Sequence, residues 1–207
     1  MENVEDIKKI ASRCLNCKTK PCQKGCPLGN DIPSFIAFIK EGKWKEAYEV
    51  LSDTTIMSAV CGEICPHQTQ CQGKCVRGIK EEPVQIGRLE SYVGEMALRE
   101  EVYNKADKKK CGKSIAIVGG GPAGLTAAAF LKRKSYNVTI YEQEELLRRY
   151  FKLWNTRISF TARKNAKTCS KYIESWYTSQ NKMQIGKRHY VRPAKRAIWC
   201  YISCNGS

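Results

Sequence analysis

The residues of this chain that could do chemistry are its cysteines, because eight of the twelve lie within one short segment. They follow the spacings C-x2-C-x4-C-x3-C-P and then C-x3-C-P-x4-C-x3-C. These residues are Cys14, Cys17, Cys22, Cys26, Cys61, Cys65, Cys71 and Cys75. Short cysteine runs that end in Cys-Pro are typical of ferredoxin-like iron–sulfur ligands. The array therefore predicts two [4Fe–4S] clusters, whose chemistry is electron transfer.

Zinc and disulfides are the two alternative uses of these cysteines. Structural zinc favours pairs of C-x2-C knuckles, and the array holds one such pair, Cys14 and Cys17. A disulfide framework needs an oxidising compartment. Residues 1–9 contain no apolar export signal, so we expect a cytoplasmic protein. Both alternatives explain less of the spacing than two clusters do.

A glycine-rich turn forms the second group of residues with chemical meaning. It follows the apolar stretch 114–118, opens an alanine-rich segment and precedes a second apolar stretch, 137–141. With an acidic residue after the second stretch, this order is the dinucleotide-binding fingerprint. The predicted cofactor-binding residues are Gly119, Gly121, Pro122, Ala123, Gly124 and Glu142. A carboxylate at the last position accepts hydrogen bonds from ribose hydroxyls and repels a 2′-phosphate, so FAD or NAD fits this turn better than NADP(H).

The charge of the chain is concentrated away from these motifs. The formal net charge is +16, which by itself would suggest nucleic acid or a membrane surface as partner. Residues 148–207 hold 14 Lys or Arg and a single acid, Glu174. This distribution argues against a nucleic-acid partner for the motif-bearing part. No apolar run is long enough to span a membrane, and His67 and His189 are isolated, so we predict no catalytic side chain.

Helices and loops must position the cysteines. Apolar periodicity predicts helices over 3–13, from an N-cap at Asp31 to Gly42, over 44–51 and over 84–104, with cysteine-bearing loops over 14–30 and 57–80. The predicted fold is an α-helical two-cluster domain followed by the start of an α/β Rossmann-type domain. The predicted segments are a helical iron–sulfur domain over 1–104, a linker over 105–113, a partial Rossmann domain over 114–147 and an irregular or disordered basic tail over 148–207. Two strands alone would leave an unpaired apolar sheet edge.

The helical cysteine region together with G-G-G-P-A-G-L at 119–125 resembles the small subunit of NADPH-dependent glutamate synthase. It is also similar to the N-terminal region of dihydropyrimidine dehydrogenase. The resemblance covers residues 10–146. It implies FAD at the glycine motif and NADPH on a second nucleotide-binding domain further along the chain. Electrons would pass from NADPH through FAD and the clusters to a larger catalytic subunit or another redox acceptor protein.

The resemblance also implies which residues bind each cluster. One set is Cys14, Cys17, Cys22 and Cys75. The second set is Cys26, Cys65 and Cys71 with a non-cysteine fourth ligand, which falls at Glu90 in this sequence. The residues alone leave Cys61 open as the eighth ligand, since four cysteines per cluster would be the simpler arrangement.

The tail departs from the resemblance. Where the family continues with a glycine pair and a segment like YGIPEFRLP, this chain reads Arg148-Arg149 and then an unrelated sequence. Codons chosen for Trp154 to Thr161 and read one base later spell GIPEFRLP. We therefore expect the tail to be an out-of-frame translation that begins near residue 147, with a genuine basic tail as the alternative.

The resulting hypothesis is a fragment of an iron–sulfur flavoprotein oxidoreductase, too short to be active alone and with weak or absent FAD binding. One alternative is a stand-alone ferredoxin-like electron carrier without flavin. A basic-tailed nucleic-acid binder is a further alternative, which the charge distribution disfavours.

Overall fold

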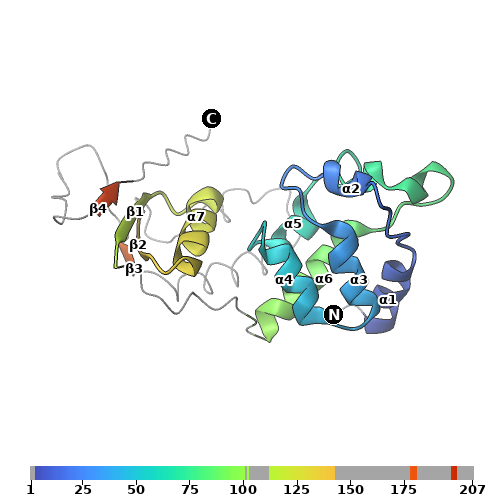
Figure 1. The fold of residues 1–207 in the computed structure, drawn as a ribbon, viewed down its shortest axis with the longest axis horizontal. Helices are drawn as coiled ribbons and strands as arrows, with labels where there is room; N and C mark the ends of the chain where they lie inside the picture. The colour runs from blue at the N-terminus through green and yellow to red at the C-terminus, as the bar shows by residue number, and fades with distance from the viewer. Residues whose placement is uncertain (1–2, 101, 103–111, 143–177, 181–196, 200–207) are drawn as a thin grey trace. The chain divides into compact units, whose positions relative to one another are not determined.

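The computed structural model describes residues 3–100, 102, 112–142, 178–180 and 197–199. These residues divide into two compact units (Figure 1). One unit is helical and contains the described residues up to 102. The other is an α/β unit that contains the described residues from 112 onward. Most of the predicted linker and tail lies outside the described residues.

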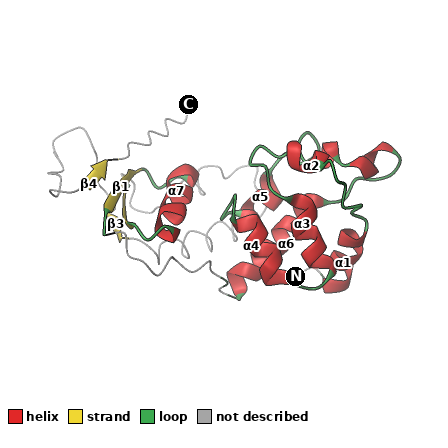
Figure 2. Ribbon diagram, in the orientation of Figure 1, coloured by secondary structure: helices red, strands yellow, loops and turns green. Residues whose placement is uncertain are grey.

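The helical unit is built from short helices joined by the cysteine-bearing loops (Figure 2). These loops gather beside α2, at one end of the longer helices (Figure 1). The elements are α1 (Val4–Ser12), α2 (Pro21–Lys24), α3 (Ile32–Lys40), α4 (Trp44–Ser52), α5 (Ser58–Ile64), the 3-10 helices η1 (Gln72–Lys74) and η2 (Val76–Ile79), and α6 (Ile86–Arg99).

Amphipathic patterns explain the longer helices. The side chain of Asn3 caps α1 by accepting a hydrogen bond from the backbone N–H of Glu5 at 3.1 Å. Helix α3 begins after Asp31, at the predicted N-cap position, and the chain leaves it through Gly42, whose φ is +74°. The apolar faces of α1, α3, α4 and α6 form the core. Its largest fully buried side chains are Ile7, Ile32, Phe35, Ile36, Ile39, Leu51, Ile86 and Leu89.

Helix α5 is a correction to the predicted loop over residues 57–80. It packs along α6 through small residues. A Cβ added at Gly62 would clash with the backbone of Ser91, and one added at Gly94 would clash with the backbone of Ala59. This close approach of the two backbones stabilises a seven-residue helix that is too short to be stable alone. Because the contact is tertiary, the local sequence carries little signal for it.

The α/β unit follows the predicted order of strand, helix and strand. Its elements are β1 (Ser114–Val118), α7 (Pro122–Arg133) and β2 (Asn137–Tyr141). Strands β1 and β2 are parallel and pair residue by residue along their whole length. Their apolar side chains at Ile115, Ile117, Val138 and Ile140 are buried. A right-handed strand–helix–strand connection of this kind places the end of β1 beside the start of α7.

Two further strands cover the edges that the sequence predicted to be unpaired. Strand β3 (Thr178–Gln180) pairs with β2, and β4 (Ala197–Trp199) pairs with β1, both in parallel. The sheet order is β3-β2-β1-β4. Both strands are three residues long and lie in the segment expected to be irregular, because strand formation depends on the neighbouring strand more than on local sequence. Among the described residues, no helix is long and apolar enough to cross a membrane.

Candidate metal centre and dinucleotide site

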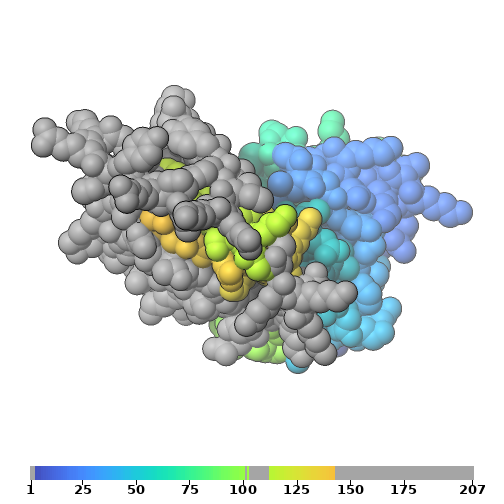
Figure 3. All heavy atoms as spheres, turned by 60° about the vertical axis from the view of Figure 1, so that its left-hand side comes forward, coloured from blue at the N-terminus to red at the C-terminus, as the bar shows by residue number. Residues whose placement is uncertain are grey.

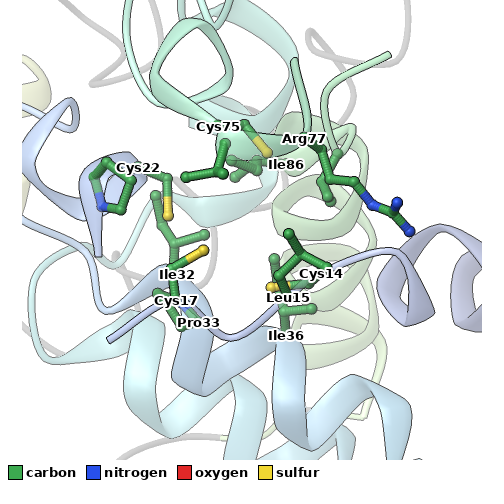
Figure 4. Close-up of a pocket in the computed structure, with 13 residues that line it drawn as sticks. Cys14, Leu15, Cys17, Cys22, Ile32, Pro33, Ile36, Cys75, Arg77 and Ile86 are labelled. Carbon is green, nitrogen blue, oxygen red and sulfur yellow. The ribbon is translucent and has the colours of Figure 1, made fainter. Parts of the chain in front are cut away.

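Four cysteines line one cavity of the helical unit (Figure 4). Their sulfur atoms face the same space, and apolar side chains such as Ile32 and Ile86 also line it. The four residues come from three places: the loop after α1, helix α2 and the junction of η1 and η2. They are Cys14, Cys17, Cys22 and Cys75. We call this set the first sulfur group.

The electrostatics of the first sulfur group reflect this proximity. Burial raises the pKa of the Cys22 thiol to about 11. The backbone N–H of Gln23 partly offsets that effect, and the charges of Cys14 and Cys75 raise the pKa further. Thiols with raised pKa values hold their protons, so binding of a metal centre here releases protons.

Cys71, Cys26, Cys65 and Glu90 form a second convergent set, the second ligand group. The side chain of Cys71 is 5% exposed, and burial raises its pKa to about 12. The next largest cause is the charge of Glu90, and the charges of Cys26 and Cys65 add to it. The four side chains therefore lie close to one another although they come from α6, the end of α2, the end of α5 and the start of η1.

Cys61 lies beside Cys65 of this second group. It donates a hydrogen bond to the sulfur of Cys65, which raises the pKa of Cys61 and lowers the pKa of Cys65 to about 7. The Cys61 sulfur also lies 3.9 Å from the hydroxyl oxygen of Thr55. The charge of Glu90 also raises the pKa of Cys61. The structure thus brings Cys61 next to Cys65 and within reach of the charge of Glu90.

Glu90 is a buried carboxyl group in the core-facing side of α6. It is 5% exposed, and its burial raises its pKa to about 8, with a smaller contribution from Cys65. The side-chain N–H of Asn30 donates a hydrogen bond to Glu90 Oε1 at 3.4 Å. The hydroxyl of Thr54 in turn donates to the side-chain oxygen of Asn30. Sequence reasoning missed Asn30 and Thr54, and the only signal was that Asn30 lies four residues after the last cysteine of the first run.

Both groups offer the kind of donors that a [4Fe–4S] cluster takes. Among the described residues, no three His, Cys, Asp or Glu side chains converge on one metal-ion position. In a cubane each ligand binds a different iron atom, so the ligands stand further apart than those of tetrahedral zinc. The eight cysteines of the array are free thiols. The donor set of two soft groups, one all-sulfur and one with a carboxylate, fits iron–sulfur ligation.

The glycine turn of the α/β unit has the backbone that a phosphate-binding turn needs. Gly119 has a φ of +96°, which disfavours any residue with a side chain. A Cβ at Gly124 would clash with the carbonyl oxygen of Gly119, so only glycine lets α7 pack this closely on β1. Gly121 precedes α7, whose first turn contains Pro122 and Ala123. The free N–H groups of this helix end attract anions.

Glu142 takes part in the turn itself. Its Oε2 atom accepts a hydrogen bond from the backbone N–H of Gly120 at 2.6 Å. The carboxylate therefore orders the turn between β1 and α7 from the end of β2. The sequence predicted a carboxylate for ribose at this position but not this contact with the turn.

Comparison with known families assigns both units. Residues 2–102 match the family described as dihydropyrimidine dehydrogenase domain II, 4Fe-4S cluster. The helical unit is a 4Fe–4S domain of this family. Residues 117–147 match the NAD(P)-binding Rossmann-like domain. The predicted resemblance is thereby confirmed, as is the predicted order of a helical iron–sulfur domain followed by the start of a Rossmann-type domain.

Relatives of the 4Fe–4S domain and the adjoining Rossmann-like segment include whole redox subunits. The chain is 37% identical over 142 residues to the glutamate synthase [NADPH] small chain of Mycobacterium tuberculosis, which is 68% of this chain and 29% of the relative. It is 40% identical over 138 residues to the NAD-dependent dihydropyrimidine dehydrogenase subunit PreT of Escherichia coli. These aligned residues cover 66% of this chain and 33% of the relative. The chain therefore spans about a third of the length of these relatives.

Proposed function

We propose that this chain is an electron-transfer segment of an NAD(P)H-dependent, flavin-linked oxidoreductase that holds two [4Fe–4S] clusters. The observation that carries the proposal is the convergence of two separate ligand groups in a single 4Fe–4S domain. Each group offers four side chains, which is the number that a cubane requires.

The proposed ligands of the first cluster are the first sulfur group, and those of the second cluster are the second ligand group. Two observations favour Glu90 over Cys61 as the eighth ligand. Glu90 is the largest charge acting on Cys71, and the thiol of Cys61 is engaged in a hydrogen bond to Cys65. A carboxylate is a harder ligand than a thiolate, so the second cluster should differ in potential from the first.

Bound [4Fe–4S] clusters supply one-electron transfer, and the chain sets how readily each accepts an electron. Cys71 and Glu90 of the second ligand group are buried, whereas Cys26 and Cys65 are partly exposed. The first sulfur group lies nearer to the surface, since its cavity is also lined by Leu15 and Val76, which are 56% and 38% exposed. Differences in burial and hydrogen bonding of this kind tune cluster potentials.

The flavin part of the proposal rests on the glycine turn. We assign FAD to the residues Gly119, Gly121, Pro122, Ala123, Gly124 and Glu142, with NADPH bound by a domain that the intact oxidoreductase carries further along its chain. The turn supplies a pyrophosphate site, but a dinucleotide crevice also needs several strands of full length. FAD affinity of the 207-residue chain should therefore be weak. The Rossmann-like match ends at residue 147, where we place the change of reading frame, and the DNA sequence of codons 143–150 tests that placement.

The partner in this proposal is a redox protein or larger subunit with an acidic surface. Segments 13–30 and 64–80, which carry most of the proposed ligands, hold seven Lys or Arg and no acidic residue. They also present the exposed apolar side chains of Leu15, Leu28 and Ile79. Figure 3 shows that the blue N-terminal segment forms part of the surface of the helical unit. Exposed apolar and basic side chains in these segments favour an acidic partner that docks beside the proposed ligands, although Arg13, Lys20 and Arg77 are already ion-paired with Glu81 or Asp31.

Metal analysis tests the proposal directly. Protein purified without oxygen should contain about eight iron atoms and about eight labile sulfides per chain. Stoichiometric zinc without iron would overturn it. Titration with FAD then separates an oxidoreductase segment from the alternative, a ferredoxin-like carrier: weak but measurable binding supports the first, and no binding supports the second.

The partner assignment has its own test. Chemically reduced protein should pass electrons faster to a flavodoxin with an acidic surface than to a basic cytochrome, and added salt should slow the first reaction. Replacing Lys18→Glu or Lys80→Glu should each slow it too, whereas Lys45→Glu on α4, which makes the same change of charge, serves as the matched control. Equal rates with both acceptors would contradict an acidic partner.

A further inference from the structure

Asn30 is a buried polar residue to which neither the cysteine spacing nor the family match assigns a role. It is 2% exposed and directly follows the loop that carries Cys26. Its backbone carbonyl accepts the N–H of Ile32 at 2.8 Å, at the start of α3. Burial of an amide side chain costs free energy unless its polar atoms find partners, so the partners identify what the residue does.

The hydrogen bonds of Asn30 fix the direction of its amide. Its side-chain oxygen accepts the hydroxyl proton of Thr54, and its N–H group donates to Glu90 Oε1 at 3.4 Å. The reversed amide would place its oxygen against a carboxylate oxygen, leaving two acceptors face to face. A carboxylate that binds iron is ionised, so only the donating orientation is compatible with ligation.

The position of this bond connects two parts of the second ligand group. Asn30 lies four residues after Cys26, and Glu90 lies on α6, 60 residues further along the chain. A buried amide between them holds the carboxylate at a fixed orientation relative to the cysteines. Thr54 at the end of α4 holds the amide from the other side. Thr54, Asn30 and Glu90 thus form a continuous chain of donors and acceptors that ends at the proposed ligand.

We propose that Asn30 is a positioning residue that raises the reduction potential of the second cluster. An N–H bond to the carboxylate withdraws negative charge from the ligand oxygen, and this favours the reduced, more negative cluster. The inference rests on the proposed function, because it requires Glu90 to be a ligand. A purely structural role would predict loss of stability on substitution but no change in potential.

Redox titration followed by electron paramagnetic resonance tests this role. In Asn30→Leu, which keeps the volume and removes the donor, the equilibrium constant for one-electron reduction of one cluster should fall about tenfold, or about 59 mV. The other cluster should keep its potential and acts as an internal reference. Thr54→Val, which leaves the amide in place but frees its orientation, should give a smaller shift in the same direction.

Ser52→Ala is the matched control. Ser52 is also fully buried near the end of α4, and its hydroxyl donates to the carbonyl of Glu49 at 2.9 Å. It should lower stability without moving either potential. Full iron content with unchanged potentials in Asn30→Leu would overturn the inference while leaving the proposed function intact. If Asn30→Leu loses its iron, the test passes to Thr54→Val, and unchanged potentials in that variant would overturn the inference. If the unsubstituted protein lacks two clusters, the proposed function itself is refuted.

Discussion

The two units assemble their candidate sites in different ways. In the helical unit, each ligand group joins segments that lie far apart in the sequence, such as Cys14 with Cys75 and Cys26 with Glu90. In the α/β unit, the turn at 119–124 is local, and the end of β2 joins it through the carbonyl of Tyr141 and the side chain of Glu142. A site of the first kind forms only when its whole domain folds. A site of the second kind forms from one strand–turn–helix unit.

The largest effect should come from removing one ligand of the first sulfur group. We expect Cys17→Ser to lower iron from about eight to about four atoms per chain and to destabilise the helical unit, since ligation and folding are coupled. Iron analysis and circular dichroism measure both effects. Ser12→Ala, an exposed neighbour whose hydroxyl bonds to the carbonyl of Lys9, is the control. Full retention of iron would show that the helical unit does not depend on its site.

The next effect distinguishes the two candidates for the eighth ligand. Glu90→Ala should change the paramagnetic spectrum and the potential of one cluster, because it removes the proposed ligand from a buried position. Cys61→Ala should keep about eight iron atoms and both spectra. The reverse pattern would transfer the role of ligand to Cys61. The paired variants are each other's control, since both truncate a side chain near Cys65.

A smaller effect should appear when the α/β unit alone is destabilised. Gly124→Val forces a side chain against the carbonyl of Gly119 and should cost about 1–3 kcal/mol in the α/β unit. Faster hydrogen exchange in β1 and α7, with unchanged iron content, is the expected result. Ala123→Val, at an exposed position of the same helical turn, is the control. Loss of iron in Gly124→Val would contradict the independence of the units.

The smallest effect concerns a helix end far from any ligand. Asn3→Ala removes the side-chain cap of α1 and should lower stability by about 1 kcal/mol. Chemical denaturation measures the loss, and iron content should not change. Asn3→Asp keeps a capping oxygen and should restore stability. A lower iron content would mean that even the fraying of α1 reaches the first sulfur group.

Sequence patterns predicted the parts of the fold that depend on near neighbours. The helix over 3–13 and the strands at 114–118 and 137–141 were visible because apolar periodicity and glycine spacing are local. The cysteine array was visible because iron–sulfur ligation requires short spacings. The contact of Glu142 with Gly120 could not be predicted in this way. Sequence spacing does not distinguish a side chain that bonds to the turn from one that bonds to a ligand.

The parts that sequence could not predict depend on tertiary contact. Helix α5 exists because Gly62 and Gly94 allow α5 and α6 to pack with their backbones close together. The same packing places Glu90 beside the cysteines of the neighbouring loops. The hydrogen bonds from Thr54 to Asn30 and from Asn30 to Glu90 form only once α3, α4 and α6 are assembled. Residues of these types are common in loops and helix ends, so their identity alone carries no signal.

The long separation between Cys26 and Glu90 also has a consequence for synthesis of the protein. At a translation rate of about 5–20 residues per second, about 4–15 s pass between the moment when Cys14, the first cysteine, leaves the ribosome and the moment when Glu90 leaves it. Throughout that interval neither the second ligand group nor the α5–α6 packing exists, and the thiols of the first run are unprotected. The nascent chain must therefore be kept reduced before it can receive iron, and the order of its residues makes cluster insertion a late event in its biogenesis.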